Sequence, residues 1–187
     1  MANKGFKVKP RTTKNIRAIS QGFKDVLKIK KSYFPIVKVV ELLHQKGIIE
    51  LEIVAVEEMA NEYGLSYPKK GLIKIREDVY DKAVKGDGFG RFTIAHEMGH
   101  FMLHRKETAY ARSSTRDHKT FEDSEWQANK FAQELLIDIR EISSEISMYE
   151  IEQKFGVSGA SSKIARDALG REGLIKMPLH KRGIYRK

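Results

Sequence analysis

Two histidines and a glutamate lie close together in one apolar stretch of the chain. His96, Glu97 and His100 form the pattern H-E-x-x-H, and the residues from Phe92 to Leu103 around them are largely apolar. In a helix, positions i and i+4 share a face, so both imidazoles can reach one metal ion at about 2.0–2.1 Å. Glu97 would then project beside the metal, where it can act as a general base on a bound water. The spacing predicts a hydrolytic zinc site.

The plain alternative is a pair of histidines that lie on the surface or are satisfied by other hydrogen bonds. The apolar neighbours indicate that the helix is buried, and two unpaired histidines are costly in an apolar interior. Metal ligation removes that cost, so we prefer it.

Catalytic zinc needs a third protein ligand and an open fourth position. His104 cannot be that ligand, because it lies roughly 12 Å from His96 along a helix axis at 1.5 Å per residue. We predict that His104 is a core or supporting residue. The metzincin pattern also fails, because it requires Gly and His where this chain has Leu103 and Lys106.

A better third ligand is Glu125, which begins a second helical pattern. Ala128, Asn129 and Ala132 follow it at i+3, i+4 and i+7, so the carboxylate lies on a face of otherwise small residues. Such a face permits close helix approach, and Gly99 in the first helix is consistent with that contact. An inward carboxylate needs a compensating charge, which zinc would supply. A solvent-facing Glu125 is the alternative, and Glu122, one turn earlier, is then the substitute ligand.

These two segments resemble the signature helices of the ImmA/IrrE family of metallo-endopeptidases. In that family an H-E-x-x-H helix is followed by a helix with the pattern E-x-x-A-N-x-F-A-x-x-L-L, and residues 88–104 and 125–136 match both. The likeness covers roughly residues 33–170. One departure is that Ile137 and Asp138 stand where family members usually have Met-Pro, so we expect the chain to leave this helix differently.

The resemblance implies a minimal zincin fold of the Glu-zincin type with one Zn²⁺ per chain. It implies that His96, His100 and Glu125 are the zinc ligands and that Glu97 is the catalytic base. It also implies that the substrate is a transcriptional repressor or similar regulatory protein, typically of the helix-turn-helix type.

A peptidase of this kind also needs a second electrophile and a path for its substrate. Tyr110, Arg112 and His118, in the polar linker between the two helices, are candidates for stabilising the transition state, although no motif supports any of them. The predicted strand 72–76 is a candidate for pairing with an extended substrate by β-augmentation.

The rest of the chain reads as a mixed α+β fold, mostly helical, with a small β-sheet beside the H-E-x-x-H helix. Periodicity and turn residues predict strands at 48–55 and 72–76. They predict helices at 14–31, 35–47, 56–64, 78–85, 91–106 and 121–139, and two short helices within 147–171 with Ser158 as an N-cap.

The length of 187 residues suits one compact domain with additions. We divide it into a basic N-terminal extension (1–32), a zincin-like metallopeptidase domain (33–146), a helical, helix-turn-helix-like subdomain (147–175) and a basic tail (176–187). No apolar run reaches the roughly 20 residues of a membrane span, and no secretory signal is recognised, so we expect no membrane association. The absence of cysteine fits a cytoplasmic protein and leaves His and carboxylates as metal ligands.

The charge of the chain supports a competing function. The net charge is +10, and residues 1–31 carry ten Lys or Arg against one acid. Basic ends can contact DNA or an acidic partner, although a solvated tail is the simpler interpretation. The Gly-Val-Ser sequence at 156–158 suits a helix-turn-helix, but Glu152 stands where a small residue is favoured. The alternative is thus a DNA-binding or protein-binding regulator with a non-catalytic metal site.

Overall fold

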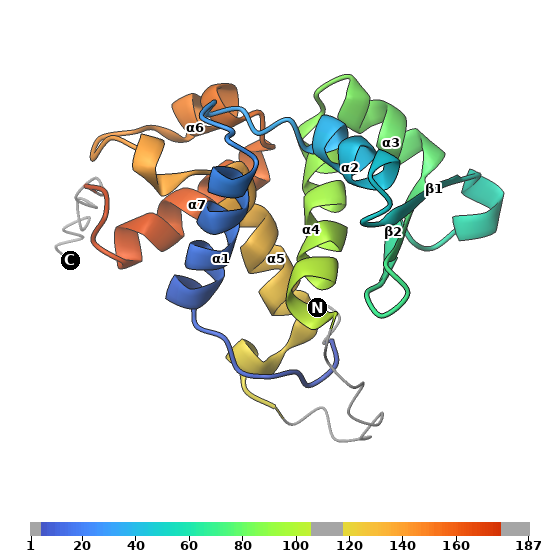
Figure 1. Cartoon of the computed structure of the whole chain (residues 1–187). Helices are drawn as coiled ribbons and strands as arrows, with labels where there is room; N and C mark the ends of the chain where they lie inside the picture. The colour runs from blue at the N-terminus through green and yellow to red at the C-terminus, as the bar shows by residue number, and fades with distance from the viewer. Residues whose placement is uncertain (1–4, 106–117, 177–187) are drawn as a thin grey trace, which may run out of the picture.

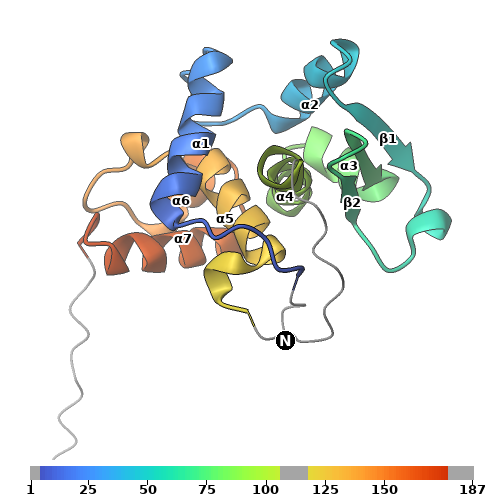
Figure 2. The same cartoon turned by 60° about the horizontal axis from the view of Figure 1, so that its bottom comes forward.

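The H-E-x-x-H helix runs through the middle of the molecule. The computed structural model describes residues 5–105 and 118–176, and in it this helix is α4, Gly88–His104. Helices α2 and α3 and the β-sheet lie on one side of α4, while α1, α5, α6 and α7 lie on the other (Figures 1 and 2). The central position explains why α4 is buried on most of its faces.

The elements follow the chain in the order α1, α2, β1, β2, β3, α3, α4, α5, α6, α7, with three short 3-10 turns between them. Their bounds are α1 Thr13–Val26, α2 Ile36–Gln45, β1 Glu50–Val54, η1 Val56–Met59, β2 Gly64–Tyr67, β3 Leu72–Arg76, α3 Glu77–Val84, α4 Gly88–His104, η2 Thr120–Glu122, α5 Ser124–Leu136, η3 Ile139–Glu141, α6 Met148–Phe155 and α7 Gly159–Arg171. The predicted α+β class, with a small sheet beside the central helix, is confirmed.

The sheet has the strand order β1-β3-β2. Strand β3 pairs in parallel with β1 and antiparallel with β2, with Ile75 opposite both Ile53 and Gly64. Strand β3 is therefore the central strand, and β2 is an edge strand that contacts α4. The edge position of β2 matters for the site described below.

Two differences from the predicted elements have clear physical reasons. The segment expected to be a helix at 56–64 is a 3-10 turn followed by β2, a strand of only four residues whose ladder bonds all go to β3. A strand this short contains too few residues for an alternation of apolar and polar side chains to be recognised in the sequence. Helix α4 begins earlier than predicted, at Gly88, because the Asp87 side chain accepts a hydrogen bond from Gly90 N and caps the helix.

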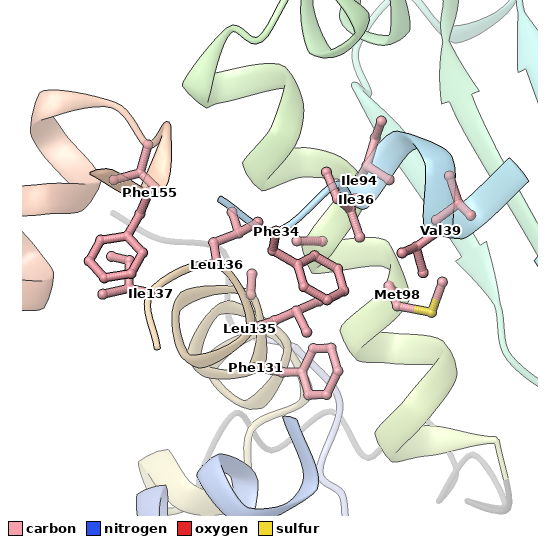
Figure 3. Close-up of a cluster of buried hydrophobic side chains, with 14 of the residues drawn as sticks. Phe34, Ile36, Val39, Ile94, Met98, Phe131, Leu135, Leu136, Ile137 and Phe155 are labelled. Atoms are coloured by element: carbon pink, nitrogen blue, oxygen red, sulfur yellow. The ribbon is translucent and has the colours of Figure 1, made fainter. Parts of the chain in front are cut away.

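The two long helices of the centre share an apolar core with α2. Ile94 and Met98 of α4 face Phe131 and Leu135 of α5, and Phe34 closes the cluster (Figure 3). All five side chains have no exposed surface. Burial of each contributes on the order of 1.5–3 kcal/mol, so this core fixes the relative position of α4 and α5.

The C-terminal helices are attached to α4 by a buried arginine. Arg91 is 1% exposed, and its guanidinium donates to Gly156 O and Phe155 O at the end of α6. Gly156 has the left-handed conformation (φ 61°) that ends α6, and Ser158 caps α7 as predicted. Within residues 5–105 and 118–176, no helix has both the length and the apolar character needed to cross a membrane.

Candidate metal centre

Three side chains from α4 and α5 converge on one point. His96 Nε2 and His100 Nε2 are 3.0 Å apart, and the Glu125 carboxylate oxygens lie 3.2 Å from the first nitrogen and 3.3 Å from the second. The three ligand atoms all lie within 4.8 Å of one another. The helix thus places the two histidines as the i, i+4 spacing predicts, and α5 brings the glutamate to them.

Close packing of α4 against α5 makes this convergence possible. A Cβ on Gly99 would stand 3.0 Å from Ala128 O and 3.1 Å from Ala128 Cα, so only a glycine fits without displacement. Asp123 caps α5 by accepting from Trp126 N, which sets Glu125 in the first turn of that helix. The small-residue face predicted for α5 is present at Ala128.

The outer nitrogen of His96 is held by a residue of α5. His96 Nδ1 lies 2.9 Å from Asn129 Oδ1. Because an amide oxygen only accepts, Nδ1 carries the proton, and Nε2 of the neutral ring presents a lone pair toward the centre.

The outer nitrogen of His100 is held through a longer chain of hydrogen bonds. His100 Nδ1 lies 3.2 Å from His104 Nδ1, and His104 Nε2 lies 3.2 Å from Gln127 Oε1. The amide oxygen of Gln127 accepts, so His104 is protonated on Nε2, and its Nδ1 accepts from His100 Nδ1–H. His100 Nε2 therefore also presents a lone pair toward the centre.

This donor set fits a divalent metal ion. Two imidazole lone pairs facing each other at 3.0 Å beside a carboxylate repel one another unless a cation lies between them. Two neutral nitrogens and one carboxylate are ligands that zinc accepts, and they leave a further position for a water or a substrate. His96, His100 and Glu125 are the residues that would hold the ion.

The pKa shifts of His104 and Glu125 fit a neutral histidine behind His100 and a charged carboxylate in the cluster. Burial and, to a smaller extent, the nearby His100 lower the pKa of His104 to about 4, so His104 is neutral near pH 7. Burial would raise the pKa of Glu125, but the close contacts with His100 and His96 outweigh it and hold that pKa below its usual range, so Glu125 is charged near pH 7.

Glu97 lies beside the cluster of three rather than within it. Its side chain is buried, and Gly64 of β2 packs directly on it, since a Cβ there would stand 2.8 Å from Glu97 Cγ. Burial raises the pKa of Glu97, against the opposing effect of His96 and His100. A carboxylate with a raised pKa, next to but outside a metal site, suits a base that takes up a proton.

Two other predicted site residues, Glu122 and His118, lie outside the cluster of three. Glu122 accepts from Lys119 N in the turn before α5 and is not one of the three converging residues. His118 Nε2 contacts Asp123 Oδ2 at 2.8 Å, at the start of α5. Tyr110 and Arg112 lie outside the described residues.

Sequence reasoning assigned no supporting role to Asn129 or Gln127. Asn129 follows Glu125 at i+4, so the sequence places it on the face that meets α4. The sequence does not indicate its hydrogen bond to His96. Gln127 is fully buried, and nothing in its spacing signals a connection to a histidine on another helix.

Comparison with known protein families agrees with this geometry. Residues 86–161 match the family model described as Peptidase_M78, the IrrE N-terminal-like domain. The matched segment contains all three converging residues and Glu97. No curated protein and no solved structure is significantly similar to the chain.

Proposed function

We propose that this chain, whose residues 86–161 belong to the ImmA/IrrE family of metallopeptidases, is a zinc-dependent endopeptidase. The observation that carries the proposal is the convergence of two imidazole lone pairs and the Glu125 carboxylate, with the buried Glu97 at their side. The match to a peptidase family and the presence of side chains that can bind zinc support the same reaction. That reaction is the hydrolysis of peptide bonds in a protein.

The chemistry divides between the metal and the chain. When bound, zinc is a Lewis acid that acidifies a water molecule and polarises the substrate carbonyl. Glu97 accepts a proton from the attacking water, and the raised pKa of this carboxyl favours that step. Glu97 then donates the proton to the amine that leaves as the C–N bond breaks. His96 and His100 are kept in the ligating tautomer by Asn129 and His104.

The substrate path differs from the one expected from sequence. The predicted pairing strand, 72–76, is β3, which is bonded on both sides and has no free edge for a peptide. Strand β2 is the edge that contacts α4, and its Gly64 touches Glu97. We therefore assign substrate pairing to β2, where main-chain hydrogen bonds would hold an extended peptide across the site.

The proposed substrate is a transcriptional repressor or similar regulatory protein. The substrate we favour is a helix-turn-helix repressor, and Tyr110, Arg112 and His118 stay candidates for stabilising the transition state. The cytoplasmic location stays a prediction from sequence.

The proposal is tested by metal content together with cleavage. We expect about one zinc per chain in the wild type and in Glu97→Gln, and loss of zinc in His96→Ala and Glu125→Ala. Cleavage of a pool of quenched fluorescent peptides should fall by at least about 10²-fold in Glu97→Gln, because its metal is kept but its base is lost. Full activity in Glu97→Gln would refute the assigned mechanism.

The Glu97→Gln variant also distinguishes a peptidase from the competing function, a DNA-binding regulator. A DNA-binding regulator would bind a duplex equally well in the wild type and in Glu97→Gln, with an affinity that falls steeply as salt rises. DNA binding of this kind in a wild type that binds no zinc would favour the regulator.

A further inference from the structure

The segment that precedes α1 lies along the start of α5. Phe6 N donates to Ser124 Oγ, and Ser124 N donates to Phe6 O. Val8 N donates to Glu122 O, and the Val8 side chain is buried. Residues 5–11, here named the N-terminal strap, therefore pair with the residues that begin α5, although this part of the sequence was assigned to a basic extension.

One end of the strap touches the residue that supplies the metal-facing carboxylate. Gly5 N donates to Asp123 Oδ2, the side chain that also caps α5. A Cβ on Gly5 would overlap Ser124 Oγ and stand 2.7 Å from Glu125 N and 2.8 Å from Glu125 Cγ. The strap thus packs on Glu125 and leaves no room for a larger residue at position 5.

The middle of the strap reaches His100 through the interior. Gln127 Nε2 donates to Lys9 O and to Phe121 O, both at 2.8 Å. These two bonds fix the Gln127 amide so that its oxygen faces His104, and His104 in turn accepts from His100. One unbroken series of hydrogen bonds therefore joins the main chain of the strap to a metal-facing histidine.

The far end of the strap is tied to the other helix. Arg11 N donates to Phe121 O before α5, and Arg11 Nη2 donates to Leu103 O in the last turn of α4. The strap thereby spans the gap between the end of one ligand-bearing helix and the start of the other.

We propose that the N-terminal strap is a positioning element of the metal centre, acting on Glu125 through Gly5 and on His100 through Gln127 and His104. Neither the strap nor Gln127 or His104 supplies a metal ligand or touches the reacting atoms. Residues that orient metal ligands from outside typically change metal affinity by about 10–100-fold when they are removed. The inference rests on the proposed metal site. It adds to that site a segment that is distant in sequence from the two signature helices.

The test uses the full chain and two variants with a matched control. Gly5→Ala wedges the strap away from Glu125, and Gln127→Leu cuts the series of bonds from Lys9 to His104. Gly22→Ala is the control, because a Cβ on Gly22 of α1 meets nothing within 4 Å. We would measure zinc affinity by competition with a chelating dye, the visible spectrum of the cobalt-loaded protein, and urea unfolding of the metal-free protein.

We expect zinc affinity to fall by about 10-fold or more in Gly5→Ala and in Gln127→Leu, with a changed cobalt spectrum in both and no change in Gly22→Ala. The cobalt spectrum reports ligand geometry, which a purely structural role of the strap would leave alone. If Gly5→Ala does not fold, Gln127→Leu decides the question.

Two results would overturn the proposal in distinguishable ways. Wild-type affinity and an unchanged cobalt spectrum in both variants, even with lower stability in urea, would reduce the strap to a structural segment while the proposed function stands. A wild type that binds neither zinc nor cobalt would remove the proposed function and this inference together.

Discussion

The two histidines of the candidate metal site are oriented by different kinds of partner. Asn129 holds His96 from the neighbouring helix, whereas His104 holds His100 from the next turn of the same helix. Both partners favour a proton on Nδ1, so both Nε2 atoms are free to ligate. The ligating tautomers are thus built into the packing of α4 and α5.

Replacing Asn129 tests this orientation directly. In Asn129→Leu, His96 loses its acceptor, so we expect zinc affinity to fall by about 10–100-fold in a chelator competition. Gln133→Leu, on the same helix, serves as the control, because the Gln133 side chain bonds to Lys130 and not to a histidine. An unchanged affinity in Asn129→Leu would mean that Asn129 does not set the tautomer.

At the scale of elements, the site depends on how closely α4 and α5 approach. The contact is made by Gly99 against the backbone of Ala128, directly between the two ligand-bearing turns. Helix α5 ends at Leu136, and Ile137 is already extended. Asp138 caps the next turn and pairs with the buried Lys24 of α1.

Adding one methyl group at Gly99 should move the helices apart. Alanine favours a helix over glycine by about 1 kcal/mol, but the overpacking at 3.0 Å from Ala128 O is expected to cost about 1–3 kcal/mol. Gly99→Ala should therefore be less stable in urea and bind zinc more weakly, while Gly22→Ala, whose site is open, should be unchanged or more stable. A more stable Gly99→Ala with full zinc affinity would contradict the close approach.

At the scale of the whole molecule, buried ion pairs attach α1 to the core. Lys24 lies 3.2 Å from Asp138, and both residues are buried. Arg17, also on α1, bonds through its guanidinium to Glu134 of α5 and to Glu172 after α7. Breaking one partner of such a pair leaves an uncompensated charge inside the protein.

The pair at Asp138 predicts a pH dependence of stability. Burial would raise the pKa of Asp138, but Arg140 and Lys24 outweigh it and lower the pKa from 3.8 to about 2. A lowered carboxyl pKa contributes stability that is complete above the unfolded pKa and is lost as pH falls through the folded pKa. We expect Asp138→Asn to cost about 2 kcal/mol or more in urea at pH 7, with a difference from wild type that shrinks between about pH 4 and pH 2. A difference that stays constant down to pH 3 would argue against this linkage.

Metal removal should lower the stability of the whole chain. Zinc at 100 times its dissociation constant stabilises the folded state by about 2.7 kcal/mol, which corresponds to roughly 5–10 °C in the melting temperature of a protein of this size. A chelator should remove this increment in the wild type and have no effect on Glu125→Ala. Equal effects of the chelator on the two proteins would place the stabilising metal at another site.

The sequence by itself determined that His96 and His100 share one face of a helix, because their i, i+4 spacing is a local property of that helix. Their role as metal ligands stays a prediction. The sequence also determined the helical character of most segments and the small-residue face of α5, since both follow from short-range patterns. The division of the chain into extension, peptidase domain, subdomain and tail stays a prediction.

Only the tertiary structure decided which residues support the candidate metal site. Asn129 meets His96, Gln127 meets His104, and Lys9 meets Gln127 across gaps of 23 to 118 positions in the chain. The edge role of β2 depends likewise on its pairing with β3, which places Gly64 on Glu97. These contacts form because buried polar groups require hydrogen-bond partners in the folded protein. A local sequence pattern does not indicate which distant residue will be the partner.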